Sequence, residues 1–189
     1  MSAENWWEYI NGYKKAGDAL LSSSNVLGIG RKEYELVYPM IFSYRHYIEL
    51  QLKEIILNAR EFLDINEKFP DVHNIEKLWA MCRELLHKMD EILDPQFTAS
   101  DGYRAILKAY KALEADLKVF WEIDPNSESF RYPVDSRGNP IVADLEAVDF
   151  RTLKELVSRI DQELGGISSG VYTILGGKYE GMKQEGLDY

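Results

Sequence analysis

Apolar and aromatic residues recur at alternating steps of three and four positions along one stretch of the chain, residues 34–62. Side chains at that spacing lie above one another on an α-helix, so the stretch predicts one long central helix with a buried face. Pro39 leaves two versions open: the regular helix begins near Tyr38, or a preceding turn meets it at a kink. The buried face is formed by Val37, Ile41, Tyr44, Ile48, Leu52, Ile55, Ala59 and Phe62, and Met40 and Ile56 widen it.

Four further segments carry the same period and predict helices that pack against the central one. In the last of them, Gly165 and Gly166 stop or interrupt the helix. Apolar residues continue in the same phase beyond these glycines, so we expect the helix to resume before a frayed tail at about residues 176–189. The four segments run from Asn5 to about Ser22, from a cap between Asp71 and Asn74 to Asp94, from Thr98 or Ser100 to Asp124, and from a cap at Asp149 onward.

Residues 125–148 form the one long stretch without helical periodicity. Two short extended runs around Gly138-Asn139 suggest a small hairpin, and Pro133 and Pro140 would limit it to edge pairing. Irregular stretches of this length are often functional, and a plain surface excursion is about equally common. The sequence therefore predicts an all-α fold: an antiparallel bundle of about five helices, one domain over residues 1–189, with an irregular or hairpin-like excursion before the last helix.

Composition narrows the function classes. A chain of 189 residues that is 46% hydrophobic and 29% charged suits one globular domain rather than a disordered protein. Cys82 is the single cysteine, and no secretory signal or apolar run of about 20 residues occurs, so we expect a cytoplasmic protein outside the membrane. The net charge of −10 disfavours extended DNA binding, which needs clustered basic residues.

Charged residues inside the central segment form a second regular pattern. Arg45, Glu49 and Lys53 stand four positions apart, so they follow one side of the helix as a ladder. The commoner explanation is that Arg45 and Glu49 pair and help to fix the orientation of the helix.

The chain holds three histidines: His46, His73 and His87. No His-x-x-x-His or Cys-His spacing exists, so we expect no metal site and no cofactor. His73 precedes a helix, and we expect it to hydrogen-bond locally near the start of that helix.

Two arginine–histidine pairs are candidate catalytic residues. Arg83 and His87 stand four apart on one helix face, and Arg45 and His46 are neighbours in the central helix. An arginine that holds phosphate and a histidine that moves a proton would suit RNA cleavage without a metal. For Arg83 and His87, an exposed charged flank is the commoner explanation.

The excursion carries candidate binding residues. Arg131 and Arg137 could grip a phosphate or carboxylate, and Tyr132 offers a stacking face. Equally, Arg131 could tie the excursion to a helix end. The predicted ligand-binding residues are Arg45, Glu49, Arg131 and Tyr132.

Two segments resemble a known family. YRHYIELQLKEIIL, residues 44–57, resembles the first core helix of HEPN domains, where Arg, then Glu four later, then Lys four later recur beside an apolar stripe. VHNIEKLW, residues 72–79, is similar to the family's His-x-(Leu/Ile)-x-x-Leu helix start, and the resemblance covers about residues 39–86. It implies an antiparallel helical bundle, frequent dimerisation, and a setting in prokaryotic phage defence or toxin–antitoxin systems.

The resemblance implies that active HEPN proteins are metal-independent ribonucleases. Their motif is an Arg followed, after four to six residues, by a His, commonly late in the domain. This chain has no histidine after His87, and three residues separate Arg83 from His87, so the motif is absent. The departure favours a non-catalytic homodimer that binds a nucleotide, RNA or protein partner. Two alternatives stay open: a divergent ribonuclease built on the arginine–histidine pairs above, and a structural interaction subunit that docks through Trp6 and Trp7.

Overall fold

The computed structural model of the protein describes residues 3–26, 34–124, 127, 130–134, 137–138 and 150–184, which form five α-helices and one short 3₁₀ helix. Within these residues the structure contains no strand beyond a single bridge residue at Val134, so the predicted all-α fold is confirmed. The elements are α1 (Ala3–Val26), α2 (Tyr34–Phe62), α3 (Ile75–Leu93), η1 (Phe97–Ala99), α4 (Asp101–Ile123) and α5 (Phe150–Gln184).

Two helix starts follow directly from capping side chains. The Asn74 Oδ1 accepts a hydrogen bond from the Lys77 backbone N–H at 2.9 Å, and the Ser100 Oγ accepts one from the Tyr103 N–H at 3.1 Å. Each cap occupies a backbone donor that the first helical turn leaves without an internal partner. Both residues were among the predicted caps, whereas the cap predicted at Asp149 lies outside the described residues.

Two helices are longer and more continuous than their breaker residues suggested. α2 begins at Tyr34 and contains Pro39 inside it, so it does not begin at Tyr38. α5 passes through Gly165 and Gly166 without a break and stays helical to Gln184, so the predicted interruption is wrong, and so is the tail predicted for residues 176–184. The reason is tertiary packing, because the apolar stripe of α5 continues into the core at Val171 and Leu175.

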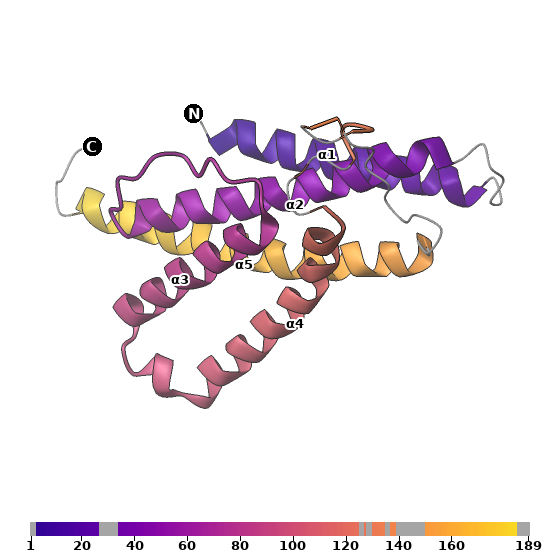
Figure 1. Cartoon of the computed structure of the whole chain (residues 1–189). Helices are drawn as coiled ribbons and strands as arrows, with labels where there is room; N and C mark the ends of the chain where they lie inside the picture. The colour runs from indigo at the N-terminus through magenta and orange to yellow at the C-terminus, as the bar shows by residue number, and fades with distance from the viewer. Residues whose placement is uncertain are drawn as a thin grey trace.

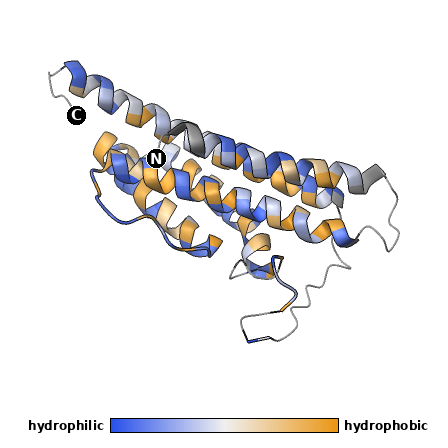
Figure 2. Ribbon diagram, turned by 90° about the horizontal axis from the view of Figure 1, so that it is seen from above, coloured by the Kyte–Doolittle hydropathy of each residue, from blue (hydrophilic) through white to orange (hydrophobic). Residues whose placement is uncertain are grey.

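The three longest helices run along one another (Figures 1 and 2). Contacts between α2 and α5 join residues separated by 114, 114 and 116 positions: Tyr47 with Asp161, Glu54 with Ser168, and Phe62 with Lys178. A constant separation means that α5 is parallel to α2. Figure 1 shows that α1 is antiparallel to α2 and that α3 is antiparallel to α4. The long connection before α5 allows α5 to run parallel to α2.

The segment between α2 and α3, residues 63–74, returns along the length of α2, and we call it the strap. Arg60 donates to the Lys68 carbonyl at 3.0 Å, the Lys53 ammonium lies 5.2 Å from the Phe69 ring centroid, and His73 reaches Glu49. Figure 1 shows the strap arching from the end of α2 back to the start of α3. Because of this return, α3 starts beside the middle of α2 and packs there, where the Cys82 Sγ lies 3.4 Å from the Leu52 carbonyl oxygen.

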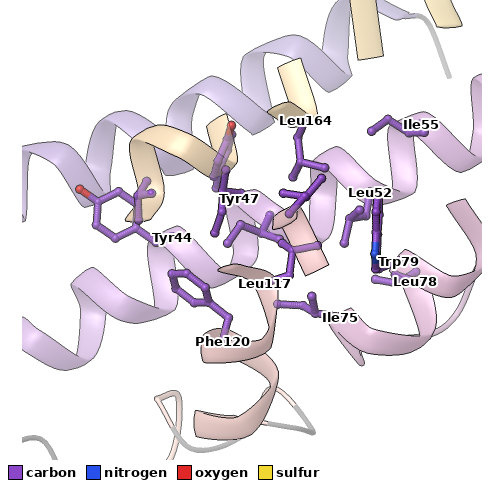
Figure 3. Close-up of a cluster of buried hydrophobic side chains, with 14 of the residues drawn as sticks. Tyr44, Tyr47, Leu52, Ile55, Ile75, Leu78, Trp79, Leu117, Phe120 and Leu164 are labelled. Atoms are coloured by element: carbon purple, nitrogen blue, oxygen red, sulfur yellow. The ribbon is translucent and has the colours of Figure 1, made fainter. Parts of the chain in front are cut away.

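A single buried cluster fills the space between α2 and the helices that surround it. Side chains from α2, α3, α4 and α5 meet in it (Figure 3). Apart from Tyr47, which was not in the predicted buried face, these positions coincide with the apolar stripes of the sequence. Prominent members are Tyr44, Tyr47, Leu52, Ile55, Ile75, Leu78, Trp79, Leu117, Phe120 and Leu164.

Two glycines of α1 predict opposite responses to the same substitution. A Cβ at Gly17 would lie 2.7 Å from the Tyr44 Cε1, whereas a Cβ at Gly12 would meet nothing within 4 Å. We expect Gly17→Ala to destabilise the protein by about 1–3 kcal/mol through overpacking. Gly12→Ala should stabilise it by up to about 1 kcal/mol, because alanine is the better helix former.

Urea unfolding of the two variants beside the wild-type chain checks this prediction. Equal shifts of the two midpoints in the same direction would contradict the close approach of α1 and α2 at Gly17.

Candidate functional site

The ladder of α2 is a buried set of charges. The exposed fractions of Arg45 and Glu49 are 1% each, and that of Lys53 is 4%. The Arg45 Nη1 lies 3.0 Å from the Glu49 Oε2, and the Lys53 Nζ lies 3.0 Å from the Glu49 Oε1. Charges at such depth persist only when they are paired and hydrogen-bonded, so Glu49 depends on both cations.

The strap and the end of α4 complete this network. The His73 Nδ1 lies 2.8 Å from the Glu49 Oε1, and the His73 carbonyl accepts from the Arg45 Nη2 at 2.7 Å. The Arg45 Nε donates to the Asp124 carbonyl at 3.2 Å and lies 3.4 Å from its Oδ2. His73 therefore bonds 24 residues back to Glu49, and the expectation of a local bond is wrong. Arg45 ties α2 to the strap and to the residue that ends α4.

The network fixes the protonation of its central carboxyl. Burial by itself raises the pKa of Glu49, but hydrogen bonds from His73 and Lys53 and the charges of Lys53 and Arg45 outweigh it. The pKa of Glu49 therefore lies below its usual range. Burial lowers the pKa of Arg45, and the nearby carboxylates of Asp124 and Glu49 oppose that shift.

His46 lies outside the ladder, although it follows Arg45 in the sequence. Its ring stacks on Phe42 at 5.6 Å between centroids and meets the edge of Tyr13 at 4.3 Å. Burial lowers the pKa of His46, so the neutral imidazole is favoured. Arg45 and His46 thus lie in different surroundings, one in an ionic network and the other among aromatic rings.

Arg83 and His87 lie on the partly exposed flank of α3, each with its own partner. The Arg83 Nη1 lies 2.9 Å from the Glu114 Oε2, and the His87 Nδ1 lies 2.6 Å from the Tyr103 hydroxyl. The His87 Nε2 lies 3.4 Å from a carboxylate oxygen of Glu91. These contacts give both residues a role in joining α3 to α4 and in the surface charge of α3.

Arg131 and Tyr132 follow the end of α4 in the chain and contact each other and Ser127. The Arg131 Nε donates to the Ser127 carbonyl at 2.5 Å, and its guanidinium lies 5.7 Å from the Tyr132 ring centroid. The positive charge of Arg131 contributes to lowering the pKa of both Arg45 and His46. Tyr132 is 57% exposed, so its ring is open to a ligand. The hairpin predicted around Gly138-Asn139 lies largely outside the described residues.

The site therefore has a buried layer and an exposed layer. The ladder lies inside, while Arg131, Tyr132 and the His73 side chain, which is 53% exposed, face solvent. The Arg131 guanidinium can contact a phosphate, and the exposed face of Tyr132 beside it can stack against a base. Across the described ranges, no three His, Cys, Asp or Glu side chains are grouped to hold a metal ion.

Comparison with known proteins identifies no similar protein. No protein-family model, no curated protein and no solved structure matches this chain. Among the helices that the structure describes, none has the length and apolar character needed to cross a membrane.

The Glu49 network predicts an acid-sensitive contribution to stability. Because the folded state lowers the pKa of Glu49, its contribution is complete above the unfolded value of about 4.3 and is lost as the pH falls through the folded pKa. We expect Glu49→Gln to cost about 3–5 kcal/mol at pH 7, since buried cations lose their partner, and to flatten the acid limb of the stability curve.

Urea unfolding between pH 2 and pH 7, a span that brackets the usual carboxyl range, measures both effects. Glu84→Gln is the matched control, because Glu84 also pairs with a lysine four positions away but is exposed, and it should change stability little. Parallel acid limbs for wild type and Glu49→Gln would contradict the network.

Proposed function

We propose that the protein is a HEPN-like helical binding protein that recognises a nucleotide or RNA phosphate without cleaving it. Arg131 and Tyr132 contact the ligand directly, and the exposed His73 side chain is a further candidate contact. The buried Arg45–Glu49 pair does not touch the ligand and has a structural role. The protein works as a homodimer in a prokaryotic defence or toxin–antitoxin setting.

The HEPN part of this proposal is supported by the way its two motif segments meet. Glu49 and Arg45 of the first segment both contact His73, the residue that opens the second segment, at 2.8 and 2.7 Å. The two segments are 24 to 28 residues apart in the chain at these contacts, so in the folded chain they pack against each other.

The binding part is supported chiefly by the exposed Arg131–Tyr132 pair. An arginine beside an open aromatic ring offers one group for a phosphate and one for a base. The exposed Arg131 guanidinium offers an anionic ligand a positive contact in a chain of net charge −10.

The proposal predicts that removing the exposed pair weakens binding while the fold stays intact. With a fluorescently labelled mixed RNA pool and with labelled ATP as probes, Tyr132→Ala should cost about 1–3 kcal/mol of binding free energy for a stacked base. Arg131→Ala should weaken binding of the same probes and reduce its dependence on salt, because one phosphate contact is lost. Fluorescence anisotropy at two salt concentrations measures both.

Arg104→Ala is the matched control, since Arg104 is an exposed arginine at the start of α4 that pairs with Asp101. It should leave binding unchanged, and the RNA should be recovered at full length from every sample. Equal affinities for wild type, Arg131→Ala and Tyr132→Ala would remove the site assignment, and shortened RNA would favour the ribonuclease alternative.

A further inference from the structure

A surface hollow lies where α1 meets the first half of α5. Its volume is about 320 Å³, and both helices contribute polar and apolar side chains to it. Leu21 and Val157 form the apolar wall of the hollow. Its polar groups come from Lys14, Asp18, Lys154 and Ser158. A hollow of this size and mixed character falls at the small end of the range for small-molecule sites.

On one side of this hollow, the lining carboxylate of Asp18 shares its cation with Asp161, a carboxylate outside the lining. The Lys14 ammonium lies 3.0 Å from the Asp18 Oδ2 and 3.5 Å from the Asp161 Oδ2, so one cation serves two carboxylates and one negative charge remains. Burial by itself lowers the pKa of Lys14, but its hydrogen bond to Asp18 and the charge of Asp161 raise the pKa overall, so Lys14 stays protonated. The side chain of Asp18 remains 48% exposed, which leaves its oxygens within reach of a ligand.

Two tyrosines of α2 hold these carboxylates in position. The Tyr44 hydroxyl donates to the Asp18 Oδ1 at 2.9 Å, and the Tyr47 hydroxyl lies 2.5 Å from the Asp161 Oδ1. Figure 3 shows both hydroxyls at the margin of the core cluster, pointing away from Leu117. Burial raises the pKa of both tyrosines, so they remain hydrogen-bond donors. The carboxylates are therefore oriented from the core and do not depend on a ligand for their placement.

The other side of the hollow carries a positive charge without a partner. Lys154 and Ser158 stand one turn apart on α5, both exposed, and neither has a hydrogen bond or ion pair within the described part of the chain. An ammonium and a hydroxyl one turn apart can both donate to one carboxylate. The hollow is thus dipolar, because Lys154 on α5 has no partner among the described residues and Asp18 on α1 has only a share of the Lys14 charge.

We propose that this hollow binds a small zwitterion of the α-amino-acid class. The ligand carboxylate accepts from Lys154 and Ser158, its ammonium donates to Asp18, and its side chain lies against Leu21 and Val157. Complementary charges at the two ends select this class, because a simple anion would satisfy Lys154 but face Asp18.

Isothermal titration calorimetry of the full chain with each of the twenty standard α-amino acids tests the proposal. We expect at least one to bind, and its decarboxylated amine and its deaminated acid to bind at least tenfold more weakly. Lys154→Gln should weaken the amino acid at least tenfold, and Ser158→Ala should weaken it in the same direction. Both positions are exposed, so both variants should fold.

Lys15→Gln is the control, because Lys15 is exposed on α1 and does not line the hollow. It should leave the affinity unchanged. The proposal is overturned if no amino acid binds the wild-type chain, if Lys154→Gln binds as tightly as wild type, or if inorganic phosphate binds as tightly as the amino acid.

Discussion

The carboxylate of Glu49 is the charge on which the arrangement of this protein depends. It lies in the interior of the protein, and Arg45, Lys53 and His73 all contact it. A buried carboxylate without such partners would cost several kcal/mol, so the residues that supply them have little freedom to move. Because His73 belongs to the strap, its contact with Glu49 helps to hold residues 63–74 against α2. The start of α3, which follows His73 directly, is placed by the same network.

Much of the fold could be predicted from the sequence, because helices depend on local spacing. The apolar stripes gave the core positions, and Asn74 and Ser100 marked helix starts through their own side chains. The course of the strap could not be predicted, since residues 63–74 have no periodic pattern and their contacts reach far back along α2. The continuity of α5 was missed because packing of its apolar stripe outweighs the helix-breaking tendency of Gly165 and Gly166.

The candidate site was predictable in part for the same reason. Arg45 and Glu49 stand four apart on one helix, and their pairing follows from that spacing. His73 and Asp124 were missed as members of the network, because their partners lie 24 and 79 residues away. The sequence did contain a signal for His73. Charges on a helix beside an apolar core need further polar partners, and a histidine just before a capped helix start was a candidate partner. No comparable signal pointed to the pairing of Tyr44 and Tyr47 with two aspartates.

The central claim is that Arg45 and Glu49, the two charges of α2 that contact the strap, are energetically coupled in one buried network. A double-mutant cycle with Arg45→Met, Glu49→Met and the double variant, followed by urea unfolding at pH 7, tests it most directly. The account predicts that each single variant leaves a buried partner uncompensated. The double variant should then be less destabilised than the sum of the two by about 2 kcal/mol or more. Additive losses would show that the two charges act independently and would contradict the account.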